Sequence, residues 1–361
     1  MIKHTSASLA AVIAACSGLA QAGGFEGDSL PIDQLFVEGN NLNISGAYVK
    51  AYDTGRYADA LGGGNAGKPY DNFVVPRMSY KHQWDENWSS AVMYNQPYLL
   101  KADYKQGAYA GQKGEINSDQ LTFLARYQME NDISVYGGIR MLKTDVSGEL
   151  PSTLVPGGYS LKLSDTTDYG YVLGAAYQIP NIALLASLTY TTAIKQKFST
   201  TETSILGTAQ SKTTIEMPKS VTLDFETGVA ADTLLFASIR WVEWKESVIA
   251  PEQYQMLFGE PLNSHKKNIF TYTLGLGHQL DENWSLAALA SYEGKDGGGV
   301  TALATTDGYK SLGGIVSYST GPVTLSAGLD YYVAYGGTDE LGTRFKDEKG
   351  VTGLFSLDYN F

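Results

Sequence analysis

Apolar and polar residues alternate along most of this chain, and a period of two is the sequence signal of a β-strand. The last eleven residues show the alternation most clearly, because Val351, Phe355, Leu357, Tyr359 and Phe361 fall on one face. Polar side chains dominate the opposite face of the same segment, and residues 181–190 and 321–333 repeat the pattern. We therefore expect a chain built almost entirely of β-strands.

Short turns and long loops alternate between these predicted strands. Turn signals rich in Asp, Asn, Gly and Pro lie at 84–87, 130–132, 180–181, 228–232, 281–283 and 320–322. Longer polar stretches lie at 53–72, 98–113, 147–164, 198–211, 248–263, 294–306 and 336–344. Six turns and seven loops divide the chain into fourteen strands. Their predicted starts lie near Asn41, Phe73, Asn87, Gly114, Asn131, Asp165, Asn181, Lys212, Asp232, Ser264, Asn283, Asp307, Gly321 and Phe345.

An even number of antiparallel strands, with short turns at one end and long loops at the other, is typical of outer-membrane β-barrels. A sheet that spans lipid must close on itself, since lipid offers its backbone no hydrogen-bond partner. Trp84, Trp88 and Trp284 lie beside short turns, where an interfacial aromatic belt is expected. The sequence predicts an all-β, 14-stranded antiparallel transmembrane barrel over residues 41–361. A soluble β-sandwich or solenoid is the alternative, but the loop asymmetry and the terminal Phe361 count against it.

The N-terminus has the features of an export signal. Lys3 precedes the apolar segment 9–15, and Ala20-Gln21-Ala22 provides a cleavage site, which predicts a signal peptide over residues 1–22. Cys16 leaves lipoprotein processing as an alternative. It is the only cysteine, so the chain left after cleavage at Ala22 could form no internal disulfide.

Charge and composition exclude several functions. The chain has 26 Lys and Arg against 38 Asp and Glu, a net charge of −12, so it lacks the basic surface that nucleic acid requires. Only three histidines, His82, His265 and His278, follow the predicted signal, and none belongs to a nucleophile–base pattern, so we expect no enzyme. Cysteine pairs, close histidine pairs and calcium-loop motifs are absent from the sequence, so we expect no metal and no cofactor.

The less apolar face of the strands is assigned to the lumen. All four arginines within predicted strands fall on it: Arg77, Arg126, Arg140 and Arg240. An arginine on the lipid face near mid-membrane would cost about 2–4 kcal/mol. These arginines either neutralise acids inside a filled lumen or bind an anionic ligand head group. The same face carries Tyr136, Phe236 and Trp244, so the lumen is partly apolar and suits an amphipathic solute.

Three segments carry a family resemblance: 24–40, 75–80 with 88–91, and 217–221 through 241–244. Together with strand number and loop order, they resemble the FadL-type long-chain fatty acid and hydrocarbon channels of bacterial outer membranes. The resemblance implies an N-terminal hatch inside the barrel, capture of substrate among the outer loops, and release sideways through the wall. The segment 23–40 is short and lacks the family's Asn-Pro-Ala motif. The sequence therefore does not decide whether this segment gates the barrel as a hatch.

The resemblance and the residues together give candidate sites. Phe25, Leu30, Leu35 and Phe36 are the apolar hatch residues of segment 23–40, although a frayed terminus is the alternative. The third strand ends at Pro97, which cannot donate to a ladder, so we expect an interrupted wall near Asn95, Gln96 and Pro97, or else a bulge at the rim.

Apolar residues in the predicted outer loops are candidates for substrate capture. They are Leu99, Leu100 and Tyr104 in one loop and Tyr254, Met256, Leu257 and Phe258 in another. Exposed apolar clusters are costly without a purpose. Residues 251–258 also fit a short amphipathic helix packed under the loops.

The predicted function is passive uptake of long-chain fatty acids or similar hydrophobic molecules across the outer membrane, followed by lateral release. A general polar-solute porin is the alternative. The expected partners are hydrophobic small molecules, outer-membrane lipids and the barrel assembly machinery, with no nucleic acid, and the chain is expected to act as a monomer. The pattern does not separate fatty acids from alkanes or aromatics, because the width of the pocket decides between them.

Overall fold

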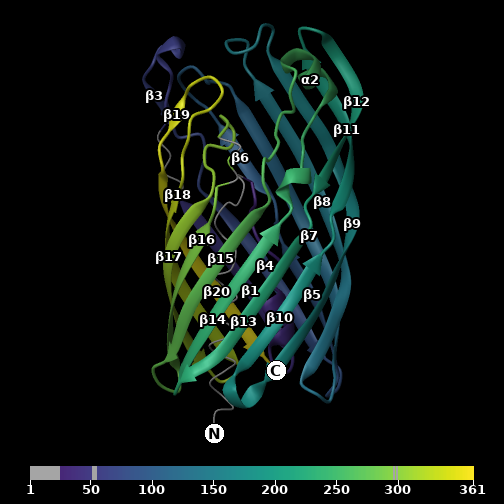
Figure 1. Ribbon diagram of the computed structural model, residues 1–361, viewed down its shortest axis with the longest axis vertical. Helices are drawn as coiled ribbons and strands as arrows, with labels where there is room; N and C mark the ends of the chain where they lie inside the picture. Colours follow the sequence, from purple (N-terminus) through teal and green to yellow (C-terminus); the bar gives the residue numbers. More distant parts are fainter. Residues whose placement is uncertain (1–24, 51–54, 296, 298–299) are drawn as a thin grey trace.

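The computed structural model describes residues 25–50, 55–295, 297 and 300–361. The predicted signal peptide and the first two residues of the predicted hatch lie outside this range. One antiparallel sheet closes on itself, because β1 (Asn41–Lys50) pairs with β4 (Phe73–Gln83) on one side and with β20 (Glu348–Asn360) on the other. The result is a tall barrel whose C-terminal end lies opposite the long loops (Figure 1).

Eleven of the fourteen wall positions are single strands and three are interrupted pairs. The remaining single strands are β7 (Lys113–Gln128), β8 (Ile133–Leu150), β9 (Tyr159–Ile179), β14 (Thr233–Val242), β15 (Ile269–Gln279), β16 (Trp284–Glu293), β17 (Tyr309–Thr320) and β18 (Val323–Ala334). The interrupted pairs are β5 (Trp88–Asn95) with β6 (Leu99–Asp103), β10 (Leu184–Thr191) with β11 (Ile194–Ser204), and β12 (Gly207–Met217) with β13 (Ser220–Ala230). This arrangement confirms the predicted all-β fold with fourteen strands.

Short elements lie at the two ends of the barrel and inside it. A small sheet at the loop end joins β2 (Gly55–Arg56), β3 (Asn65–Gly67) and β19 (Arg344–Phe345). The helical elements are η2 (Ile32–Phe36), η3 (Asp59–Leu61), η4 (Pro180–Ile182), η5 (Trp244–Glu246) and α2 (Glu252–Phe258). The helix α2 matches the short helix that the sequence allowed over 251–258.

The prediction of a long loop at 198–211 is wrong. β11 and β12 continue through this segment and meet in a tight hairpin at Ser204 and Gly207. The loop predicted at 147–164 is also shorter than expected, because β8 reaches Leu150 and β9 begins at Tyr159. Strands that rise beyond the apolar band carry polar residues on both faces, so their sequence looks like a loop.

The outer surface of the wall is apolar, as expected of the lipid-facing parity. Ile139, Leu274 and Leu312 are exposed by 48%, 56% and 66% on this surface. Trp84, Trp88 and Trp284 are also exposed, beside the short turns. Such a surface would be costly in water and suits the hydrocarbon of a bilayer. No helix in the described part of the chain combines the length and apolarity that a membrane crossing needs.

Candidate functional site

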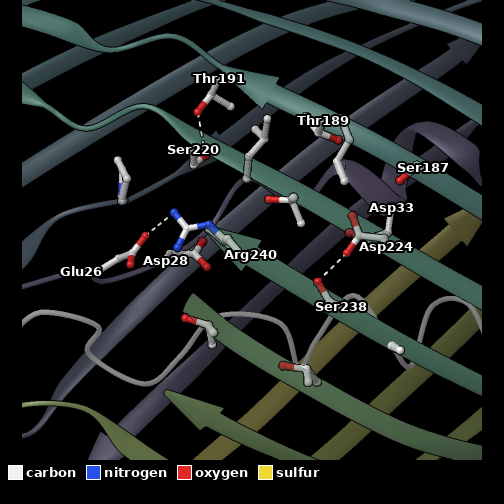
Figure 2. A pocket seen from close by; sticks show the side chains of 18 of the residues that line it. Glu26, Asp28, Asp33, Ser187, Thr189, Thr191, Ser220, Asp224, Ser238 and Arg240 are labelled. Carbon is white, nitrogen blue, oxygen red and sulfur yellow. Dashed lines mark hydrogen bonds and ion pairs between the residues drawn. The ribbon is translucent and has the colours of Figure 1, made fainter. Parts of the chain in front are cut away.

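The N-terminal segment, residues 25–40, lies inside the barrel and is tied to the wall by two ion pairs. Arg77 Nε lies 2.7 Å from each carboxylate oxygen of Asp28, and both side chains are almost completely buried. Glu26 pairs with Arg240 on β14 in the same way, as Figure 2 shows. Two of the four predicted lumenal arginines therefore neutralise acids of the chain itself.

Apolar contacts hold the rest of this segment. Leu35 is completely buried, and Leu30 and Phe36 pack against the same apolar cluster. Phe36 also makes an edge contact with Tyr136, with ring centroids 5.5 Å apart, and the Arg126 guanidinium lies 5.0 Å from its ring centre. Of the four predicted hatch residues, Phe25 and Leu35 are buried, and Leu30 and Phe36 are partly buried against an apolar cluster inside the barrel.

The wall is interrupted between β4 and the β5–β6 pair. The β4–β5 ladder ends at Met78 and Tyr94, and β6 pairs with β7 but not with β4 in the described sheet. Continuing the register would place Pro76 opposite Gln96 and Val75 opposite Pro97. Neither proline has an N–H group to donate, so the ladder cannot continue through this stretch.

The backbone of the N-terminal segment occupies the edge that this interruption leaves. The Gly27 N–H donates to the Pro97 carbonyl at 2.8 Å, and the Leu99 N–H donates to the Phe25 carbonyl at 2.9 Å. Asn95 Nδ2 donates to the carbonyl oxygens of Asp28 and Ser29, each at 3.3 Å. The segment and the interrupted strand are therefore one hydrogen-bonded unit.

An apolar cavity of about 230 Å³, here called the upper cavity, lies among the outer loops. Its apolar lining includes Phe25, Leu100, Ile116, Val146, Leu150, Leu154, Val155, Tyr159, Leu161, Ile249, Tyr254, Phe258, Leu262, Leu303 and Leu341. For scale, an engineered protein cavity of about 150 Å³ binds benzene. The upper cavity therefore has room for a small hydrophobic molecule or part of a long one.

A second cavity of about 150 Å³, the lower cavity, lies on the other side of the N-terminal segment. Hydroxyl groups line much of it, among them Ser187, Thr189, Thr191, Ser220 and Ser238 (Figure 2). Apolar patches come from Leu185, Phe225 and Phe236, and Pro97 and Tyr98 bring the wall interruption to its edge. Two residues at the wall interruption therefore belong to the lining of the lower cavity.

Aromatic rings separate the two cavities. Phe25 packs edge-on against Trp244, with ring centroids 5.1 Å apart, and Trp244 also contacts Tyr98 at 6.0 Å and His265 at 5.0 Å. Trp244 is completely buried. Phe25 lines the upper cavity and Tyr98 lines the lower cavity, so this cluster of rings lies between the two.

The other two predicted arginines have neutral partners. Arg126 Nε donates to Ser134 Oγ at 3.0 Å, and its terminal nitrogen donates to Gln128 and Gln178. Arg140 donates to Gln120 Oε1 at 3.3 Å and to the Thr192 carbonyl. Only Arg140 and Arg240 of the four line the lower cavity.

The predicted capture residues fall into two groups. Leu100, Tyr254 and Phe258 line the upper cavity, and Leu257 packs against the cluster beneath it. Tyr104 is buried among other rings and donates to the Ala302 carbonyl at 2.7 Å, so it supports the loops instead. Met256 is 65% exposed and, like Leu99, does not line the cavity.

The carboxyl group of Asp33, on η2, faces the lower cavity near Asp224 (Figure 2). Burial raises the pKa of Asp33 to about 6, although the Arg77 charge opposes the shift. Docking of the segment therefore buries an acid that titrates near neutral pH.

Sequence reasoning missed two parts of this site. It did not find the acids Glu26 and Asp28 as partners of the lumenal arginines, although both lie in the predicted hatch. It also missed Pro76, the second proline at the wall interruption, which breaks the strand pattern of 73–83. Within the described residues, no group of three or more His, Cys, Asp or Glu side chains is arranged to hold a metal ion.

No protein-family model matches the chain, and comparison with curated proteins finds no relative. Solved structures do match it over almost its whole length. A FadL homologue of Pseudomonas aeruginosa superposes with a TM-score of 0.70 at 14% identity, covering 99% of this chain and 98% of its own. The Pseudomonas putida toluene transporter TodX gives 0.65 at 17% identity, covering 92% of each chain. The Ralstonia pickettii toluene transporter TbuX gives 0.63 at 14% identity, covering 90% of each chain. The chain therefore has the fold of the FadL-type channels.

Proposed function

We propose that this protein is a channel of the bacterial outer membrane for the passive uptake of hydrophobic molecules. The observation that carries the proposal is the position of the N-terminal segment. Its Phe25 ring separates an apolar upper cavity from the lower cavity, and its backbone occupies the interrupted edge of the wall. Displacing one segment would therefore open both the passage and the wall.

The upper cavity is the proposed capture site. Burying apolar surface there gains about 25 cal/mol per Å², or about 0.8 kcal/mol for each methylene group. A molecule with a long apolar tail or an aromatic ring would gain free energy on entering from water. The apolar lining contributed by Leu100, Tyr254 and Phe258 supports this role.

Release is proposed to occur sideways, through the interruption at Asn95, Gln96 and Pro97. A molecule that leaves the lumen at the turn end of the barrel enters water. A molecule that leaves through the wall enters lipid, where the free energy of a hydrophobic molecule is lower. The lower cavity reaches Pro97 and Tyr98, which supports an exit at this height of the wall. The neighbouring solved structures include toluene transporters and monoaromatic hydrocarbon channels, which is consistent with substrates of this kind.

The proposed function rests on the apolar part that long-chain fatty acids and uncharged hydrocarbons share. It differs from the alternative of a polar-solute porin in the electrical behaviour that it predicts. Two ion pairs and the apolar residues of the N-terminal segment fill the lumen, so the purified protein should pass little ion current.

The test combines uptake with conductance. Cells that carry the protein in an intact outer membrane should accumulate radiolabelled hydrophobic compounds faster than cells that lack it. The purified protein should give no steady conductance in planar bilayers. Large steady conductance without any gain in hydrophobic uptake would establish a porin and overturn the proposal.

A further inference from the structure

The upper cavity has several acids in its lining. Glu149, Glu260, Asp339 and Glu340 all line it, together with Glu115. Lys113 is the only basic residue among the lining residues, and its Nζ lies 3.1 Å from Glu149. A carboxylate that entered this cavity would meet excess negative charge.

Three of these acids crowd one another. Burial and the nearby charges of Glu260 and Asp339 raise the pKa of Glu340. The Asp339 carboxylate accepts hydrogen bonds from the Tyr109 hydroxyl and the Thr343 N–H, so it is held in place. Asp339 is therefore fixed in place, and these three acids come from the segments after α2 and before β19.

The lower cavity also carries more acids than bases. Its lining includes six carboxyl groups and two guanidinium groups. They are Glu26, Asp28, Asp33, Asp224, Glu226 and Glu293, with Arg140 and Arg240. Arg240 is paired with Glu26, and Arg140 gives its terminal N–H groups to neutral oxygens. Acids therefore outnumber bases in the lining of both cavities, and Arg140 is the guanidinium of the lower cavity whose hydrogen-bond partners are neutral.

We propose, on the basis of the function proposed above, that this channel selects uncharged hydrophobic molecules and rejects carboxylates. The acidic lining of the upper cavity sets this selectivity at the point of capture. An apolar tail gains the same free energy whether its head is neutral or charged. In the upper cavity a carboxylate head additionally loses hydration and meets only Lys113, which is already paired with Glu149. Burial of an unpaired charge is far more costly than burial of a hydroxyl group.

The experiment compares three ligands with one tail. Radiolabelled decanol, decanoate and decylamine are equilibrated at pH 8 with the purified full-length protein, and binding to protein-free detergent is subtracted. Decanol should bind about tenfold or more tightly than decanoate, because the decanoate carboxylate loses hydration on entering the cavity. A tenfold difference in affinity corresponds to about 1.4 kcal/mol of binding free energy. Decanoate binding as tight as decanol binding would overturn the inference, and loss of that binding in Arg140→Gln would then assign the head group to Arg140.

A charge variant tests the source of the discrimination. Glu260→Gln/Glu340→Gln should raise decanoate affinity severalfold and leave decanol affinity unchanged. Glu282→Gln, in a short turn at the opposite end of the barrel, is the matched control and should change neither. Unchanged decanoate affinity in the double variant would overturn the role of these acids.

The remaining outcomes are also distinct. Decylamine binding more tightly than decanol would make the site cation-selective and overturn the inference. Failure of all three ligands to bind would instead contradict the proposed function, since the hydrophobic tail alone should then gain nothing from the upper cavity.

Discussion

Breaking the Asp28–Arg77 ion pair should release the N-terminal segment from the lumen. Asp28 is completely buried and Arg77 nearly so, and Arg77 Nε makes two contacts of 2.7 Å with the carboxylate. Replacing Arg77 by Met leaves the Asp28 carboxylate buried without its cation. Removing one partner of a buried ion pair typically costs about 3–5 kcal/mol.

That cost applies only to the docked state, because a displaced segment exposes Asp28 to water. With about 1.4 kcal/mol for each factor of ten, the equilibrium constant for undocking should rise by a factor of roughly 10² to 4 × 10³ in Arg77→Met. The double variant Asp28→Leu/Arg77→Met removes both charges and should recover most of the loss, since an apolar pair of similar size often replaces a buried ion pair without penalty.

Thiol labelling measures this equilibrium. Cys16 is the only cysteine of the chain and lies in the predicted signal peptide, so Ile32→Cys would give the mature protein a single thiol on η2, where the native side chain is 7% exposed. When docking is fast relative to modification, the labelling rate follows the undocked population. Labelling should accelerate in Ile32→Cys/Arg77→Met and return towards the parent rate when Asp28→Leu is added.

Equal labelling rates in all three proteins would refute the reasoning, because the ion pair would then contribute nothing to docking. Equally fast labelling in the single and double charge variants would show that Arg77 acts through its shape rather than its charge. Arg56→Met is the matched control, since Arg56 lies in the outer loops and its side chain is 70% exposed.

Three further predictions test other parts of the account. In Gly27→Ala the new methyl group would lie 2.7 Å from the Gln96 carbonyl oxygen, so the segment should separate from the interrupted strand and thiol labelling at position 32 should rise; an unchanged rate would count against the close approach. Because the docked pKa of Asp33 is about 6, above its ordinary value of 3.8, Asp33 stabilises docking most below about pH 4, and this contribution is lost as pH rises through 6. The labelling rate, divided at each pH by the rate of the unfolded protein to remove the titration of the thiol itself, should therefore rise with pH; Asp33→Asn should remove this rise, and a rise that persists would assign it to another group. Leu274→Arg places a charge on the outer face at the middle of β15 and should lower the free energy of unfolding in bilayers by about 2–4 kcal/mol, as measured by urea titration, whereas no loss would contradict the lipid-facing assignment.

The sequence was sufficient to predict the barrel because its signal is local and repeated. Alternation placed Phe355 and Leu357 on one apolar face and Arg77 and Arg240 inward, and a bilayer enforces that parity on every strand. The loop at 198–211 was mispredicted because Thr200 and Thr213 meet in a strand pair beyond the apolar band, where alternation fades.

The partners of the lumenal side chains could not be predicted from the sequence. Parity placed Arg77 and Arg240 inside but left two interpretations, because it does not reveal what lies opposite them. Their partners Asp28 and Glu26 are 49 and 214 positions away in the chain, and only folding brings each pair together. The interruption at Pro97 was predictable from proline chemistry, whereas its occupation by the Gly27 and Phe25 backbone depends on three-dimensional contacts.

The most direct test of the account is a reversible lock between the N-terminal segment and the wall. Glu26 and Tyr98 face each other in an antiparallel bridge, a geometry that brings two cysteines within disulfide range. Uptake of a radiolabelled hydrophobic compound is measured in cells that carry Glu26→Cys/Tyr98→Cys, before and after addition of a membrane-permeant reductant. The account predicts negligible uptake in the oxidised protein and recovery on reduction. Equal uptake in both states would contradict the claim that the N-terminal segment must leave the wall for a molecule to pass.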